Sequence, residues 1–244
     1  MKTAVTSRKN KAIAHFRSLA SDRDYRRERR EFLCEGGKLL LEALASGARV
    51  ISVLAREDAA LPPLREDVAV YSVPAELLSY ASRMDNPADL IFSCAMPVTE
   101  KIDPSRFDRV IILDGLQDPG NVGTIIRTAD AFSIGLVALT GPTADPYNPK
   151  TVRATMGAVF RQKIGFYSPE ELRELRPAAT VLSPGAEDIR AKRPKAVVIG
   201  SEGSGISPEM LRICSGEIMI PMSGGAESLN AAAAAAIVMW EMVR

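Results

Sequence analysis

Three short segments of this chain combine glycine with polar side chains in a way that suits a ligand pocket. In the first segment glycines flank Asn121, and Arg127 lies further into the same predicted helix. A helix N-terminus with a fixed arginine is a natural place for a phosphate or a carboxylate. Asn121 also fits a simple N-cap and Arg127 a surface cation. The neighbouring Ile125 and Ile126 mark a buried stripe, which favours a guanidinium that is held in place.

The other two segments also follow apolar strands. In the sequence VVIGSEGSGIS a buried strand ends at Gly200, and Glu202 is the single acid among three glycines. In the third segment, a glycine-bearing loop leads to Ser228 and Asn230, directly before an alanine-rich helix. Ser and Asn are good helix caps, so the third segment alone indicates a cap more readily than a site. The three junctions together favour a pocket.

The residues that this chain lacks restrict its chemistry. His15 is its single histidine, which excludes the Ser-His-Asp and Cys-His mechanisms and most zinc sites. The cysteines are odd in number, widely separated and without metal-ligand spacing, so we expect small buried side chains in a reducing cytoplasm. No P-loop or convincing GxGxxG follows a strand. We therefore expect no metal, and a reaction that depends on other groups or on a reactive cosubstrate.

The elements that position these segments alternate between strand and helix, which predicts an α/β protein with an open parallel sheet. An apolar run at 109–113 suits a strand that is buried on both faces. The further strands are predicted at 135–139, 163–166, 180–182, 196–199 and 217–220, and the helices at 122–132, 150–159, 169–175, 208–213 and from 231 onward. Ligands of such sheets lie at the carboxyl ends of the strands.

A second, smaller α/β unit is predicted before residue 97. Its helices are expected at 7–20, 38–45 and 75–81, and its strands at 31–34, 50–54, 68–71 and 90–95. The polar segment 97–106, which contains two prolines, reads as the linker. The chain is 46% hydrophobic and 25% charged, as in ordinary globular proteins. Its longest apolar run, 231–240, is about half of a membrane span, so we expect no membrane contact.

Charge is distributed unevenly, although the net charge is only +1. The first 31 residues contain ten Lys or Arg against four acids, which indicates contact with a phosphate backbone, the alternative being a solvated helix face. The expected RNA-binding residues are Arg8, Lys9, Lys11, Arg26, Arg27, Arg29 and Arg30.

The three glycine-bearing segments also resemble a known family. NVGTIIRTADAF, VVIGSEGSGIS and IPMSGGAESLNAAAAAAI are similar to the three signature motifs of the SpoU/TrmH family of RNA ribose 2′-O-methyltransferases, over about residues 109–244. The stretch FLCEGGKLLLEALASG resembles, more weakly, the small substrate-binding domain, similar to ribosomal protein L30e, that precedes the catalytic domain in the rRNA-directed branch. The resemblance implies an L30e-like RNA-binding domain at 1–100 and a Rossmann-like catalytic domain at 107–244.

The resemblance further implies a C-terminal trefoil knot and a homodimer with the site near the subunit interface. S-adenosylmethionine would bind in the knotted loops, beside Leu139, Thr140, Gly141, Gly200, Ile220, Met222 and Leu229. The catalytic and substrate-facing set would be Asn121, Arg127, Glu202, Ser228 and Asn230. In the role we favour, Arg127 orients an RNA phosphate and stabilises the developing alkoxide, because an arginine barely deprotonates and is a poor base.

The expected reaction transfers a methyl group from S-adenosylmethionine to a ribose 2′-hydroxyl. Ribosomal RNA is favoured over tRNA because of the N-terminal domain. The alternatives are a tRNA ribose methyltransferase, a knotted enzyme that methylates a base, and a non-catalytic RNA-binding or ribosome-assembly factor with the same fold. Binding of S-adenosylmethionine distinguishes the enzymes from the last of these.

Overall fold

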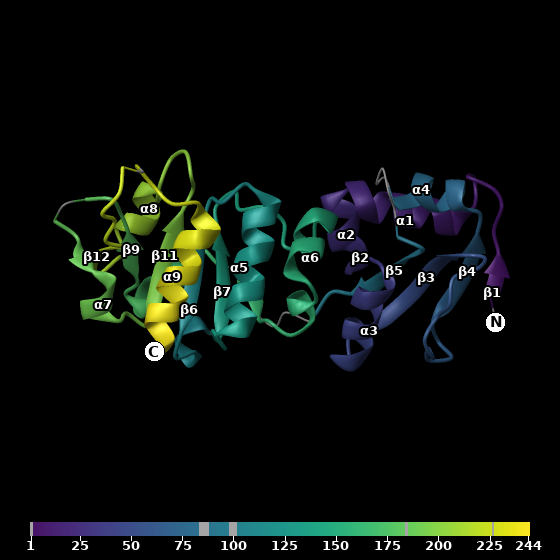
Figure 1. The fold of residues 1–244 in the computed structure, drawn as a ribbon, viewed down its shortest axis with the longest axis horizontal. Helices are drawn as coiled ribbons and strands as arrows, with labels where there is room; N and C mark the ends of the chain where they lie inside the picture. Colours follow the sequence, from purple (N-terminus) through teal and green to yellow (C-terminus); the bar gives the residue numbers. More distant parts are fainter. Residues whose placement is uncertain (1, 83–87, 98–101, 184, 226) are drawn as a thin grey trace. The chain divides into compact units, whose positions relative to one another are not determined.

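The computed structural model describes residues 2–82, 88–97, 102–183, 185–225 and 227–244. The chain forms two compact units, and each unit is built from two separate stretches of sequence. Met1–Val98 and Tyr147–Phe160 form the first unit, and Thr99–Pro146 and Arg161–Arg244 form the second. The elements of both units are labelled in Figure 1.

The first unit contains a mixed sheet of five strands among the residues described. The strands are β1 (Lys2–Ala4), β2 (Glu31–Glu35), β3 (Val50–Arg56), β4 (Ala69–Val73) and β5 (Leu90–Ala95). They lie in the order β1-β4-β3-β5-β2; β1, β4 and β3 are parallel, and β5 is antiparallel to both of its neighbours. The sequence predicts four of these strands and misses β1, whose three residues are all exposed and give no alternation.

Helices cover both faces of this sheet. They are α1 (Lys11–Ser21), α2 (Arg23–Arg29), α3 (Gly37–Ala45), α4 (Ala75–Ser82) and α6 (Pro149–Thr155). On one face Phe16 of α1 and Leu78 of α4 pack on Leu33 of β2. The adjacent Phe32 points to the opposite face and packs with Leu40 of α3. The two cores follow from the alternation of side chains along a strand.

Helix α6 differs from its expected position in the fold. The alternating pattern predicts a helix at 150–159 as part of the second unit. In the structure the segment Tyr147–Phe160 belongs to the first unit, and Val152 and Val159 join the core around Phe32. The periodicity of the segment identifies a helix with an apolar face but carries no information about which core that face joins.

The second unit contains a parallel sheet of seven strands among the described residues, which confirms the predicted fold class. The strands are β6 (Val110–Asp114), β7 (Leu136–Thr140), β8 (Ile164–Phe166), β9 (Ala178–Thr180), β10 (Glu187–Asp188), β11 (Ala196–Gly200) and β12 (Gly216–Met219). Their order is β10-β12-β9-β11-β6-β7-β8. The apolar residues of β6 are fully buried, as expected for a central strand covered on both faces.

The helices of the second unit are α5 (Pro119–Ala131), α7 (Ile189–Lys192), α8 (Pro208–Leu211) and α9 (Ala231–Val243), with short 3-10 turns η1 (Pro104–Arg106) and η3 (Pro169–Leu175). Helices α5 and α9 pack against each other, and α9 also packs on β11. Figure 1 shows both helices on the same face of the sheet. No helix in the described part of the chain is long and apolar enough to cross a bilayer.

Candidate active site

The carboxyl ends of three neighbouring strands form the floor of the site. In the sheet register Asp114 of β6 lies beside Thr140 of β7 and beside Gly200 of β11. The Asp114 carboxylate is buried. Its Oδ1 accepts a hydrogen bond from Thr140 Oγ1 at 2.6 Å, and its Oδ2 accepts one from the Ser207 backbone N–H at 2.7 Å. One carboxylate therefore ties two strand ends to the loop after β11.

That loop is held in a tight, closed shape. Ser201 and Gly205 exchange two backbone hydrogen bonds of 2.9 Å each, and Gly205 adopts a left-handed φ of 68°. A Cβ atom on Gly200 would lie 2.5 Å from the carbonyl carbon of Gly205, which is too close for any side chain. Glycine is therefore required at position 200, and the loop carries Glu202 in a fixed place.

Three polar side chains from distant parts of the sequence meet above this loop. Asn121 Nδ2 donates to Glu202 Oε1 at 2.5 Å, and Asn230 Nδ2 donates to Asn121 Oδ1 at 3.1 Å. We call this chain of contacts the amide–carboxylate network. It confirms that the junctions at Asn121, Glu202 and Asn230 converge, as expected from strands whose carboxyl ends meet at one edge.

Two helix caps fix the orientation of the network. Asp118 is the N-cap of α5, and its Oδ1 accepts from the Asn121 backbone N–H at 2.7 Å. Asn230 is the N-cap of α9, and its Oδ1 accepts from the backbone N–H groups of Ala232 and Ala233 at 2.9 and 3.2 Å. Since the Asn230 oxygen is engaged by the helix, its amide nitrogen faces Asn121. The cap and the site role of Asn230 therefore coexist.

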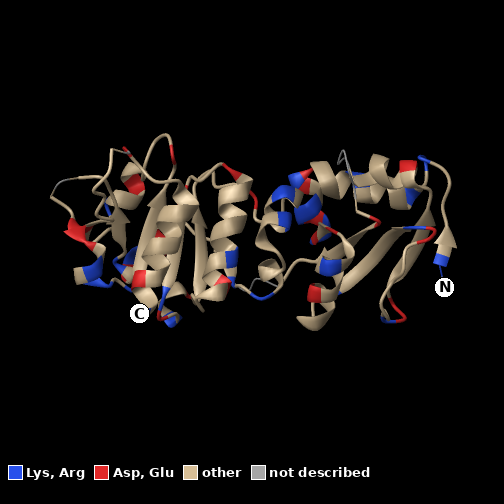
Figure 2. Ribbon diagram, in the orientation of Figure 1, with Lys and Arg blue, Asp and Glu red and all other residues tan. Residues whose placement is uncertain are grey.

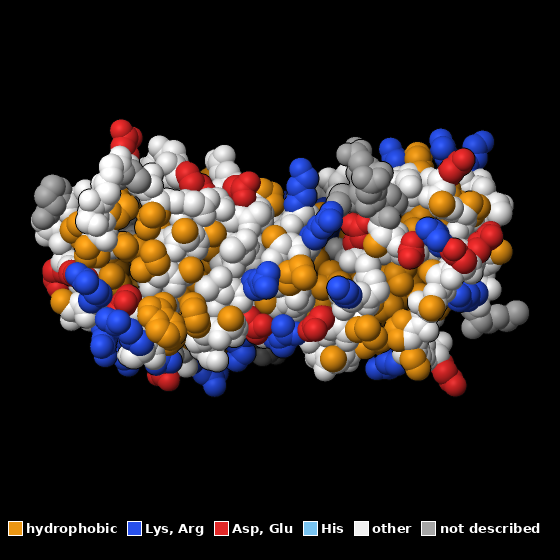
Figure 3. Space-filling view, in the orientation of Figure 1, with side chains coloured by type: hydrophobic (Ala, Val, Ile, Leu, Met, Phe, Trp, Pro, Cys, Tyr) orange, Lys and Arg blue, Asp and Glu red, His pale blue; other side chains and the backbone are white. Residues whose placement is uncertain are grey.

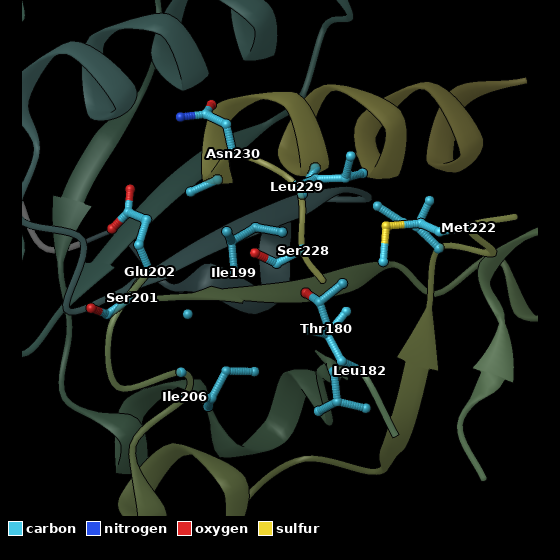
Figure 4. A pocket seen from close by; sticks show the side chains of 16 residues that line it. Thr180, Leu182, Ile199, Ser201, Glu202, Ile206, Met222, Ser228, Leu229 and Asn230 are labelled. Carbon is cyan, nitrogen blue, oxygen red and sulfur yellow. The ribbon is translucent and has the colours of Figure 1, made fainter. Parts of the chain in front are cut away.

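A cavity of about 560 Å³ opens beside the network. Its lining comes from three stretches of chain: Thr180, Val181, Leu182; Ile199, Gly200, Ser201, Glu202, Gly205, Ile206; and Ile220, Met222, Ser228, Leu229, Asn230, Ala231, Ala234. Figure 4 shows Glu202 and Asn230 toward one end, and Met222 and Leu182 toward the other. The cavity is thus apolar along most of its length and polar where the network borders it.

The chemistry of this lining fits S-adenosylmethionine. The apolar side chains of Ile199, Leu229 and Met222 offer a surface for a flat purine ring. Gly200 borders the cavity with backbone atoms alone. The Glu202 carboxylate supplies a negative charge at the polar end, where it would attract a cationic ligand.

Four of the seven residues expected to contact the cofactor line this cavity, namely Gly200, Ile220, Met222 and Leu229. Leu139, Thr140 and Gly141 are not among its lining residues. Leu139 and Thr140 are fully buried in β7, and the Thr140 hydroxyl is engaged by Asp114. The contact of this strand end with the cofactor therefore stays a prediction, and the buried side chains of Leu139 and Thr140 do not reach this cavity.

The expected catalytic residues fall into two groups. Glu202, Ser228 and Asn230 line the cavity, and Asn121 contacts two of its lining residues. Arg127 is different: it is exposed on α5, and it has no hydrogen bond or ion pair with any residue that the structure describes. The expectation of a held guanidinium is therefore wrong for this single chain, because Ile125 and Ile126 are buried on other sides of the helix.

Some residues of the site were not expected from the sequence. Asp114 organises its floor, and Thr180, Leu182 and Ile206 line the cavity. A signal for Asp114 was present, because it is the acid at the carboxyl end of the most apolar strand, directly before a glycine. Thr180 and Leu182 carry no such signal, since they lie at the end of a short strand.

Figure 2 marks the Lys and Arg positions along the ribbon of the first unit, and the side chains of its basic segment are only partly available to a ligand. Arg26 is 2% exposed, and its guanidinium donates to the Leu19 carbonyl oxygen at 2.8 Å, so its expected RNA contact is corrected to a structural role. Arg30 is exposed but donates to the Pro97 carbonyl at 3.0 Å. The other expected RNA-binding residues, Arg8, Lys9, Lys11, Arg27 and Arg29, are exposed.

Known proteins share both units of this chain. The SpoU rRNA Methylase family matches residues 108–240, and the MRM3-like substrate binding domain matches residues 10–91. The chain is 32% identical to the 23S rRNA (guanosine(2553)-2′-O)-methyltransferase RlmP of Bacillus subtilis, over 98% of each chain. It is 31% identical to the 23S rRNA (uridine(2479)-2′-O)-methyltransferase of Streptomyces viridochromogenes, over 98% of this chain and 91% of that one.

A solved structure agrees with these relatives. The crystal structure of an AdoMet-bound rRNA methyltransferase from Sinorhizobium meliloti superposes with a TM-score of 0.85 at 31% identity, covering 98% of this chain and 97% of that one. The family match covers the whole sheet region in which Asn121, Glu202 and Asn230 converge. The chain belongs to the SpoU rRNA methylase family.

Proposed function

We propose that this protein transfers a methyl group from S-adenosylmethionine to a ribose 2′-hydroxyl of ribosomal RNA. The observation that carries the proposal is the apolar cavity with the amide–carboxylate network at its polar end. Relatives that span the whole chain methylate ribose in 23S rRNA, one at a guanosine and one at a uridine. The reaction is therefore inferred from the site, and the class of RNA from the relatives.

The bound cofactor would supply a methyl group on a positively charged sulfur, which is an electrophile that needs no further activation. The task of the protein is to bring a ribose hydroxyl into line with that group and to remove its proton. Asn121 has both ends of its amide engaged, so it positions Glu202 and Asn230. Ser228 lines the cavity and is exposed, so its hydroxyl is free to contact the ribose.

Arg127 is the group proposed to act on the RNA. Because it forms no ion pair among the described residues, its guanidinium is available for a phosphate next to the reacting ribose. A positive charge there would stabilise the developing alkoxide. Removal of the proton is then assigned to solvent or to the RNA phosphate, since an arginine keeps its own proton.

The functional state is proposed to be a homodimer formed through α5 and α9. Trp240 is 51% exposed and Ile237 is 38% exposed, and the Trp240 ring lies 5.8 Å from that of Phe132. Figure 3 shows hydrophobic side chains gathered over α9. Large apolar side chains in such a cluster indicate an interaction surface. Arg127 is exposed on α5, so a second copy on this surface would place the guanidinium at the interface.

Two further features complete the proposal. The C-terminal segment is inferred to form the trefoil knot of the family, since the loop before α9 closes the cavity together with the loop after β11.

The three cysteines are free, which suits a reducing cytoplasm. Burial and the nearby Asp114 charge raise the pKa of Cys214 to about 11, so it is not a nucleophile at neutral pH.

The decisive experiment incubates the purified protein with labelled S-adenosylmethionine and unmodified 23S rRNA, 16S rRNA and tRNA. We expect label in 23S rRNA, protection of one ribose from alkaline cleavage, and no label on any base. Label in tRNA alone would favour the tRNA enzyme. Binding of RNA without any binding of S-adenosylmethionine by calorimetry would identify a non-catalytic RNA-binding factor and overturn the proposal.

A further inference from the structure

Two arginines of the first unit converge on one tyrosine ring. The Cζ atom of Arg17 on α1 lies 4.0 Å from the centroid of the Tyr80 ring, and that of Arg8 lies 4.7 Å from the same centroid. Tyr80 belongs to α4, which packs against α1. We call Arg8 and Arg17, which share the Tyr80 ring, the stacked arginine pair. Neither Arg17 nor Tyr80 is among the RNA-binding residues expected from the sequence.

Contacts within the first unit restrict this cluster before a ligand binds. Arg17 Nη1 donates to the Tyr80 carbonyl oxygen at 2.9 Å, which fixes the guanidinium at the end of α4. Arg8 lies in an ordered turn, in which the Asn10 N–H donates to the Ser7 carbonyl at 3.1 Å. The Tyr80 ring itself packs against the apolar core. The arginines therefore lose less side-chain freedom on binding than unrestrained arginines would.

The two positive charges lie close together at this ring. Both guanidinium carbons lie within 5 Å of one ring centroid, so their separation is shorter than ~10 Å, the Debye length at 0.1 M salt. Within the described part of the chain, neither arginine forms an ion pair with a carboxylate. The sequence explains part of this, because residues 2–21 contain five Lys or Arg and no Asp or Glu.

A fixed pair of unpaired guanidinium groups suits a phosphodiester. A planar guanidinium group donates to phosphate oxygens in a fixed geometry, and an anion that contacts both groups would reduce their mutual repulsion. The overall charge of the protein is only +1, so its attraction for RNA has to come from a few basic residues at defined positions, such as this pair. We propose that the stacked arginine pair binds the phosphate backbone of the substrate RNA, an inference that rests on the proposed function for the identity of that RNA.

The first test measures the affinity of Arg8→Gln and Arg17→Gln for unmodified 23S rRNA between 50 and 200 mM salt. Loss of one phosphate contact should lower the slope of log affinity against log salt by about 0.7 to 0.9, and weaken binding about tenfold at 0.1 M salt. Arg65→Gln is the matched control. It removes the same charge from the same unit, but Arg65 is already paired with Asp67 at 3.0 Å.

The second test separates the charge from its placement. Tyr80→Phe keeps an aromatic ring beneath both guanidinium groups and should bind RNA as the wild type does, whereas Tyr80→Leu should resemble the arginine variants. A thermal melt of each variant checks that the fold is retained, and Arg8→Gln carries the test if a change at the other two positions unfolds the protein, since Arg8 is exposed. Equal affinities for Arg8→Gln, Arg17→Gln and Arg65→Gln would overturn the proposal, as would equal affinities for the two Tyr80 variants.

The two proposals fail in different ways. If the wild type methylates rRNA but its affinity is insensitive to the arginine pair, the pair has no role in RNA binding and the enzymatic function stands. If the wild type binds no S-adenosylmethionine while Arg8→Gln still lowers the salt slope for RNA, the enzymatic function fails and the phosphate site stands. Calorimetry with S-adenosylmethionine on every variant should give an unchanged cofactor affinity.

Discussion

The amide–carboxylate network of the second unit and the stacked arginine pair of the first unit differ in how their polar groups are paired. In the network the polar side chains satisfy one another: the Asn121 amide is engaged at both ends, and Asn230 also caps a helix. In the arginine pair two like charges lie close together, and neither forms an ion pair with a carboxylate of the described residues. The hydrogen bonds within the network keep the cavity in shape for a small molecule. The two positive charges of the arginine pair are balanced only when an anionic ligand binds.

The largest effect is expected from Arg127, an unpaired cation like those of the arginine pair, but one that lies in the unit that holds the cavity. Arg127→Ala should lower kcat at least about 100-fold, because the charge that stabilises the alkoxide is lost. The affinity for S-adenosylmethionine should stay unchanged, since Arg127 does not line the cavity. Steady-state kinetics and calorimetry measure the two quantities. A parallel collapse of cofactor affinity would contradict the role given to Arg127.

The next largest effect should come from the loop that presents Glu202. Gly200→Ala forces a methyl group against the backbone at Gly205, and overpacking of this kind costs about 1 to 3 kcal/mol. We expect a loss of cofactor affinity of about tenfold or more, measured by calorimetry. Gly203→Ala is the control, because a Cβ at that position meets no atom within 4 Å. If both substitutions had the same effect, steric closure at Gly200 would not be the cause.

A double-mutant cycle measures how far the network acts as a unit. Asn121→Ala and Glu202→Ala should each weaken cofactor binding, and the double variant should lose less than the sum. We expect a coupling of about 1.5 to 3 kcal/mol, typical of one hydrogen bond to a charged group. The same cycle on Arg8 and Arg17, with RNA as the ligand, should show coupling only through a shared phosphate. Additive losses in the network would show that Asn121 and Glu202 act independently.

The smallest effect concerns the folding of the first unit. Burial by itself raises the pKa of Glu31, but hydrogen bonds with His15 and Ser93 and the charges of His15 and Arg29 outweigh it and lower the pKa below its usual 4.5. A carboxyl of this kind stabilises the fold above its unfolded pKa, and the contribution disappears as the pH falls through the folded pKa.

Glu31→Gln should therefore lower the free energy of unfolding at pH 7 by less than about 1 kcal/mol, because the group is partly exposed and screened. The difference from the wild type should shrink below pH 4.5. Urea unfolding at several pH values measures this, with the exposed Glu66→Gln as control. A difference that grows toward acid pH would show that the ionised form of Glu31 does not stabilise the fold.

The parts of the structure that follow from the sequence are those controlled by local rules. The apolar run at 109–113 predicts a buried strand, which the structure has at Val110–Asp114. The meeting of Asn121, Glu202 and Asn230 follows because parallel strands end at one edge. The features that the sequence does not predict depend on tertiary packing. Nothing in the pattern of α6 shows that Val152 joins the first core, and nothing in the run of basic residues shows that Arg26 turns inward.

The double role of Asn230 offers a way to time the opening of the cavity. Its side-chain oxygen shields the backbone amides of Ala232 and Ala233, while its nitrogen joins Asn121 at the rim. If the rim opens by rotation of this side chain, both amides lose their acceptor at the same moment. Exchange of these two hydrogens with deuterated water would then report the open fraction of the rim, and slower exchange in the presence of S-adenosylmethionine would show how far the cofactor suppresses opening.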